Sequence, residues 1–117
     1  MRRVLWIVVG LCCFFVQTTS LTARETKVGS KAFTESVILG EIIFQMVEQS
    51  GAEAVHRRQL GGTRILWEAL KAGEIDVYPE YTGTLINEIL VGHELKTDYE
   101  RAGFLESLGL RLGGVIG

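Results

Sequence analysis

The chain has 117 residues, which is enough for one domain and leaves little room for a second. Twelve Lys and Arg against fourteen Asp and Glu give a net charge of −2, so the composition does not favour a nucleic-acid partner, which needs a basic face. Hydrophobic residues at 47% and charged residues at 22% are typical of a globular protein, and two adjacent cysteines, Cys12 and Cys13, exclude a disulfide scaffold.

The N-terminus has the pattern of an export signal. Two arginines precede an apolar run of thirteen residues at 4–16, which is shorter than the roughly 18 residues of a membrane-spanning helix. Small polar residues follow, so we predict a secretory signal peptide at 1–23, with cleavage after Ser20 or Ala23. The alternative is an uncleaved membrane anchor. The prediction places the protein in the periplasm or another extracytoplasmic location and leaves 24–117 as its functional domain.

The first two predicted elements are a strand and a helix. Thr26 to Gly29 is a short extended stretch. Thr34 is a candidate N-cap for a helix that starts at Glu35, whose apolar residues recur at helical spacing. Gly51 is a natural end for this helix.

A second strand and helix follow. Ala54 to Gln59 alternates like a strand, and the glycines at 61 and 62 predict a turn. Thr63 is a candidate N-cap for a helix over 64–72. Three charged residues of that helix are spaced to form ion pairs on its exposed face: Arg64, Glu68 and Lys71.

The last third of the chain continues the alternation. Ile75 to Tyr78 is predicted as a third strand, and a short helix follows at 84–90. Thr97 and Glu100 match a capping box at the start of another helix, which should end near Leu108.

Leu110 to Ile116 is apolar and resembles a further strand. Strands that alternate with helices predict an α/β fold with a parallel sheet. Ligands of such sheets bind beyond the carboxyl ends of the strands, so the loops after the three predicted strands are the candidate site.

Each of these loops has a functional and a structural interpretation. In the first, Lys31 lies just before a helix start, which favours an anion, although a solvated lysine is the alternative. In the second, the two glycines before Thr63 allow the backbone to approach a ligand, although a tight turn and an N-cap are the alternative explanation. The third, 76–84, holds Tyr78 and Tyr81, whose ring faces suit a quaternary ammonium cation unless both simply cover the sheet edge.

The sequence predicts no catalytic residues, metal site or cofactor. Asp76 and Glu80 suggest an acid–base pair, but no nucleophile or metal cluster accompanies them. The two histidines, His56 and His93, are isolated and lack the spacing of metal ligands.

Several of these segments together resemble a known family. Residues 28–36 (VGSKAFTES), Leu39 to Glu41, Gly61 to Thr63 and the run 73–84 (GEIDVYPEYTGT) are similar, in order and distance, to the substrate-binding proteins of ABC transporters for glycine betaine, choline and related osmoprotectants. The resemblance covers essentially the whole chain after the predicted leader.

The resemblance implies a parallel-sheet lobe of a periplasmic-binding-protein-like (type II) fold. It implies a non-enzymatic protein that captures a small quaternary ammonium ligand and delivers it to an ABC permease in the inner membrane. Matched residue by residue, Lys31 and Thr84 would hold a ligand carboxylate, and Tyr81 would form one wall of an aromatic cage. Ser30 and Thr63 would be supporting positions.

Family members are more than twice as long and have a second lobe. We therefore expect 24–117 to correspond to the first, incomplete part of lobe one. Two alternatives follow from that length: an interaction or regulatory protein built on a half-lobe, or a non-functional fragment. An exported hydrolase that uses Asp76 and Glu80 is a third alternative from a different class.

Overall fold

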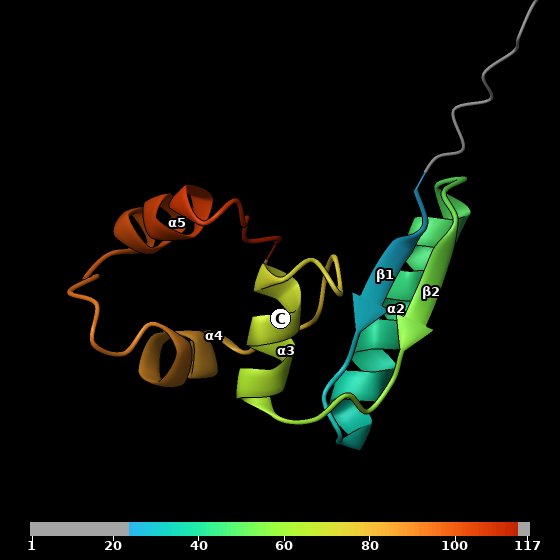
Figure 1. Ribbon diagram of the computed structural model, residues 1–117, viewed down its shortest axis with the longest axis horizontal. Helices are drawn as coiled ribbons and strands as arrows, with labels where there is room; N and C mark the ends of the chain where they lie inside the picture. The colour runs from blue at the N-terminus through green and yellow to red at the C-terminus, as the bar shows by residue number, and fades with distance from the viewer. Residues whose placement is uncertain (1–23, 115–117) are drawn as a thin grey trace, which may run out of the picture.

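The computed structural model describes residues 24–114, so the predicted leader at 1–23 lies outside the described residues. Two parallel strands, β1 (Thr26–Gly29) and β2 (Ala54–Arg57), form its sheet, with Val28 opposite His56 and Gly29 opposite Arg57. Figure 1 shows the two strands side by side with helix α2 (Thr34–Gln49) along them. Both predicted strands are confirmed, although β2 ends two residues earlier than expected.

The predicted third strand is present only as a single bridge. Val28 and Val77 form an isolated parallel bridge, in which Val77 O accepts a 2.8 Å hydrogen bond from Gly29 N. On the same edge, Asp76 N donates to Lys27 O at 2.8 Å. The segment around Val77 therefore lies on the side of β1 opposite β2, and β1 is the central strand.

Helix α2 (Thr34–Gln49) starts one residue earlier than predicted. Its N-cap is Phe33, and no side chain makes a capping hydrogen bond there, so the expected role of Thr34 as a cap is wrong. The helix ends as predicted, because Gly51 adopts a φ of +91° and its N–H bonds to Glu48 O at 3.0 Å.

Helix α3 (Thr63–Lys71) packs on the other face of the sheet from α2. A β-carbon built at Gly29 would lie 2.7 Å from Ile75 Cδ1 and 3.1 Å from Leu66 Cδ1. Side chains on the α3 side therefore approach the β1 backbone closely. The neighbouring side chain of Ser30 points instead to β2 residue His56, under α2. Successive residues of a strand face opposite sides, which explains this division.

The exposed face of α3 matches the sequence prediction. Glu68 lies 3.9 Å from Arg64 and 3.0 Å from Lys71. On the other side of the helix, Leu66, Trp67 and Ala69 are buried, whereas Ile65 is exposed.

Trp67 connects the sheet region to a second core that contains α5 (Asp98–Ser107) and the turn before it. The predicted helix at 84–90 is a single turn, α4 (Thr82–Thr84), followed by a π-helix, η1 (Leu85–Ile89). Leu90 N donates to Leu85 O at 2.9 Å, five residues back, as a π-helix requires. Figure 1 shows these segments on the far side of α3 from β1 and β2. The buried members of this core are Trp67, Leu85, Ile89, Leu90 and Leu105.

The capping box of α5 is confirmed. Glu100 N donates to Thr97 Oγ1 at 3.1 Å, and Thr97 N donates to Glu100 Oε2 at 3.1 Å. The strand predicted from Leu110 onwards is not formed within the described part of it, 110–114. Across residues 24–114, no helix combines the length and the apolar character that crossing a bilayer requires.

The structure assigns a capping hydrogen bond to Thr97 and none to Thr34, and two substitutions test this assignment directly. Thr97→Ala removes a cap hydrogen bond and should lower the free energy of unfolding by about 1 kcal/mol. Thr34→Ala removes no cap hydrogen bond and should change it by less than about 0.5 kcal/mol. Chemical denaturation followed by circular dichroism measures both. Equal losses in the two variants would contradict the assignment.

Candidate functional site

Lys31, predicted from the first loop, is buried at the centre of the three loops. Its Nζ donates to Glu80 Oε1 at 2.6 Å and to Thr63 Oγ1 at 3.0 Å, and its side chain is 5% exposed. The alternative interpretation of a solvated lysine is therefore wrong. Thr63, expected to cap α3, uses its hydroxyl to hold Lys31 and makes no cap hydrogen bond.

Glu80 provides the negative charge of this cluster. Besides Lys31, the backbone N–H of Tyr81 donates to its Oε1 at 3.0 Å, and the Tyr78 hydroxyl donates to its Oε2 at 3.1 Å. Burial raises the pKa of Tyr78 well above its usual value, and the adjacent Glu80 carboxylate adds to the shift. Tyr78 therefore stays protonated and donates to Glu80.

Tyr81 presents an aromatic surface beside this ion pair. Its ring is stacked on Phe33, with centroids 6.3 Å apart and planes inclined by 25°. Phe33 and Tyr81 are 42% and 39% exposed, so both rings retain free surface. Partial burial raises the pKa of the Tyr81 hydroxyl, and the Glu35 carboxylate acts in the same direction. The sequence motif contained Phe33, but nothing in its spacing predicted the ring pair.

The other two predicted site residues lie differently. Thr84 is half-buried in α4, three residues after Tyr81. Ser30 is fully buried, and its Oγ lies 2.9 Å from His56 Nε2, so its side chain points toward α2 rather than toward Lys31. The structure thus brings Lys31, Thr63 and Glu80 together and turns Ser30 away from them.

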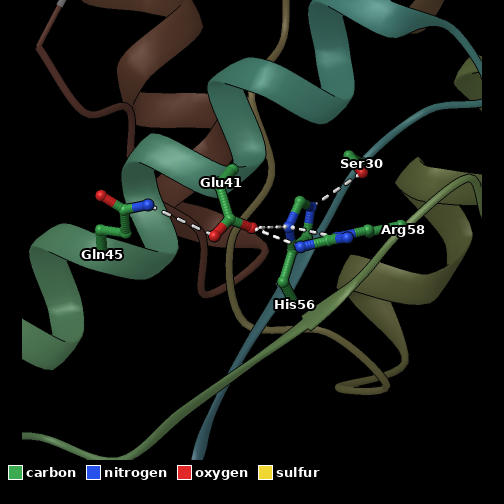
Figure 2. Close-up of polar contacts among 5 residues, drawn as sticks. All are labelled: Ser30, Glu41, Gln45, His56 and Arg58. Carbon is green, nitrogen blue, oxygen red and sulfur yellow. Dashed lines mark hydrogen bonds and ion pairs between the residues drawn. The ribbon is translucent and has the colours of Figure 1, made fainter.

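The partner of Ser30 belongs to a polar network that the sequence did not predict. His56 Nδ1 lies 2.9 Å from Glu41 Oε2, and Arg58 Nη2 donates to the same oxygen at 2.9 Å. Figure 2 shows the imidazole between Ser30 and Glu41, with Arg58 on the same side of the carboxylate as His56 and Gln45 on the opposite side. A neutral histidine whose Nδ1 donates to Glu41 accepts a hydrogen bond from the Ser30 hydroxyl at Nε2.

This order of groups matches that of a Ser–His–acid triad, but it does not form a nucleophilic site. Ser30 has no exposed surface, so its hydroxyl cannot meet a substrate. The network instead connects α2, β2 and the residue that precedes Lys31, which fixes the backbone of the first loop.

A glycine in the middle of α2 makes room for this network. A β-carbon at Gly40 would lie 2.6 Å from His56 Nε2 and 3.1 Å from Ser30 Cβ. A glycine inside a helix costs stability relative to alanine, so its presence at an otherwise helical position signals a close contact. Gly40 is therefore the sequence signal from which a close contact at this point of α2 could have been predicted.

Asp76 and Glu80 do not form the acid–base pair that their spacing suggested. Asp76 Oδ1 accepts from Arg24 at 2.9 Å, and its Oδ2 accepts from Lys27 N at 2.8 Å, whereas Glu80 bonds to Lys31. Within residues 24–114, no group of three or more His, Cys, Asp or Glu side chains lies close enough to hold a metal ion.

Two glycine substitutions test the contact between α2 and His56. Gly40→Ala should lower the free energy of unfolding by about 1–3 kcal/mol, because the new methyl group overlaps His56. Gly103→Ala, on α5 where no atom lies within 4 Å of the added carbon, should raise it by about 0.5–1 kcal/mol. Denaturant titration measures both, and a neutral Gly40→Ala would refute the contact.

Acid titration tests the network itself. Hydrogen bonds from His56 and Arg58 hold the pKa of Glu41 below its ordinary 4.5. The stabilisation of the folded state by the Glu41 carboxylate is thus complete above about pH 4.5. It is lost as the pH falls through the lowered pKa of Glu41. In Glu41→Gln the free energy of unfolding should fall less steeply in that acid range. NMR titration of the Glu41 carboxyl carbon measures the shift directly, and an ordinary pKa would be the contrary result.

Comparisons with known proteins agree with the fold. Residues 24–114 match the family model described as the substrate binding domain of an ABC-type glycine betaine transport system. The glycine betaine-binding protein YehZ of Escherichia coli K12 is 49% identical over 61 residues, which are 52% of this chain and 20% of that protein.

A solved structure of apo YehZ from Escherichia coli superposes with a TM-score of 0.57 and 36% identity, and covers 74% of this chain and 31% of that one. The chain therefore spans less than a third of the length of these relatives, and the predicted α/β periplasmic-binding-protein fold is confirmed for the part it shares with them. The family binds solutes and is not catalytic, so the alternative of a hydrolase that uses Asp76 and Glu80 is wrong. The match over residues 24–114 shows that this chain belongs to the substrate-binding domain family of ABC-type glycine betaine transport systems.

Proposed function

We propose that the chain is part of the extracytoplasmic solute-binding component of an ABC importer for quaternary ammonium osmoprotectants such as glycine betaine or choline. The observation that carries the proposal is the exposed Phe33–Tyr81 ring pair next to the buried Lys31–Glu80 ion pair. Family membership and the printed name of the relative YehZ support the same ligand class.

Tyr81 is the proposed contact for the cationic end of the ligand. A quaternary ammonium group has no N–H to donate, so it is recognised by the negative faces of aromatic rings rather than by hydrogen bonds. Tyr81 has the exposed surface that such a contact needs, and Phe33 holds its ring orientation from behind. Each contact of this kind contributes only about 0.5–2 kcal/mol, so tight capture requires further rings and a desolvated cleft.

Lys31 and Thr84 are the proposed contacts for a ligand carboxylate, where the ligand has one. Thr63 supports this role because its hydroxyl accepts a hydrogen bond from Lys31 Nζ. Ser30 supports it through the backbone, since the network with His56 fixes the residue adjacent to Lys31. The proposed partners are thus a small zwitterion or cation and an ABC permease in the inner membrane. The signal peptide predicted at 1–23 fits that location.

Substitution of Tyr81 tests the site. In the protein expressed from its complete gene, Tyr81→Ala should weaken choline or glycine betaine binding about 2- to 30-fold for one lost cation–π contact, and more if the cage closes around it. Tyr81→Phe keeps the ring and should retain most of the affinity. Isothermal titration calorimetry measures both.

Tyr99→Ala is the matched control, because Tyr99 is an 89% exposed tyrosine on α5. It should leave both affinities unchanged. If Tyr81→Ala and Tyr99→Ala bind alike, Tyr81 is not a ligand contact.

A further inference from the structure

Within residues 24–114, the ammonium group of Lys31 has one N–H donor left for a ligand. A lysine ammonium carries three N–H donors. Lys31 Nζ gives two of them to Glu80 Oε1, at 2.6 Å, and to Thr63 Oγ1, at 3.0 Å. The third is the donor that a ligand carboxylate would use in the proposed function. The strength of that contact depends on how far Glu80 neutralises the ammonium, because both side chains are largely withdrawn from water.

Glu80 shares its negative charge among several donors. Besides Lys31, its Oε1 accepts a hydrogen bond from the backbone N–H of Tyr81 at 3.0 Å, and its Oε2 accepts one from the Tyr78 hydroxyl at 3.1 Å. The positive end of each N–H or O–H dipole offsets part of the carboxylate charge. Glu80 therefore neutralises Lys31 less completely than a carboxylate that had no other donor.

The Tyr78 hydroxyl is fixed both in position and in protonation state. Its ring packs against a buried apolar cluster of Leu66, Ala69 and Ile75. Pro79 follows Tyr78 in the chain, and a proline fixes its own φ and restricts the residue before it to extended backbone. Burial raises the pKa of the Tyr78 hydroxyl, and the Glu80 carboxylate adds to the shift, so the group keeps its proton at neutral pH. Glu80 Oε2 thus faces a permanent donor.

We propose that Tyr78 determines how well the site binds ligands with a carboxylate, because its hydrogen bond to Glu80 keeps Lys31 available to them. Without the hydroxyl, the charge of Glu80 would act on Lys31 with less compensation and would repel a ligand carboxylate more strongly. Tyr78 is then a positioning residue, which acts through Glu80 and does not touch the ligand. This inference rests on the proposed function and deepens it, since it assigns part of the carboxylate recognition to a group outside the ligand contacts.

The variant Tyr78→Phe gives the first test, because it removes the hydroxyl and keeps the ring in its apolar cluster. Titration calorimetry on the protein expressed from its complete gene compares glycine betaine with choline, which has no carboxylate. Glycine betaine affinity should fall about three- to tenfold, for one lost hydrogen bond to a charged group. Choline affinity should not fall, because the charge of Glu80 attracts its cation. Equal losses for both ligands would indicate a purely structural role and overturn the proposal.

A double-mutant cycle with Glu80→Gln gives the second test. The glutamine keeps the size of the side chain but has no charge for the Tyr78 hydroxyl to offset. If Tyr78 acts through that charge, adding Tyr78→Phe to Glu80→Gln should leave the ratio of glycine betaine affinity to choline affinity unchanged. A ratio that falls as far in the double variant as in Tyr78→Phe alone would show that Tyr78 does not act through Glu80, which would refute the proposal.

Tyr99→Phe is the matched control, because it removes the same hydroxyl from a side chain that is 89% exposed on α5. Its affinity ratio should equal that of the unmodified protein. The two failures are distinguishable: if the unmodified protein binds neither glycine betaine nor choline, the proposed function fails and the inference with it. If it binds them with a ratio that Tyr78→Phe does not move, only the inference fails.

Discussion

The buried ion pair between Lys31 and Glu80 is the constraint on which the arrangement of the three loops depends. Lys31 follows β1, Thr63 begins α3, and Glu80 follows the segment that bridges to β1, so one ammonium group joins three separate parts of the chain. Such a pair contributes little net stability compared with apolar side chains, but loss of one partner is costly. It therefore acts mainly to fix the relative positions of these loops.

Small residues on and beside the central strand allow the helices to approach it from both sides. Gly29 leaves space for Ile75 and Leu66 on the α3 side, and Gly40 leaves space for His56 on the α2 side. Ser30, between these two layers, is small enough to be fully buried while its hydroxyl remains bonded. The site loops thus extend from a strand whose packing tolerates almost no change in side-chain size.

The sequence predicted most elements, because helical spacing and glycine positions are local properties of the chain. It predicted the third strand only in part, since Val77 pairs by a single bridge. Its main errors concern threonines: Thr63 was expected to cap a helix but binds Lys31, a contact between residues 32 positions apart. The Glu41–His56 contact was missed for the same reason, because it depends on how α2 lies over β2.

The π-helix after α4 makes the chain sensitive to length at one point. In η1 the five-residue hydrogen bond from Leu90 N to Leu85 O places both Ile89 and Leu90 next to Leu85 in the core that Trp67 joins. An α-helix of the same sequence would turn Leu90 away from that core. Loss of a single residue between Leu85 and Leu90 would convert the segment to an ordinary helical turn without disturbing the hydrogen bonds on either side. Such a deletion would therefore change which side chains the core receives.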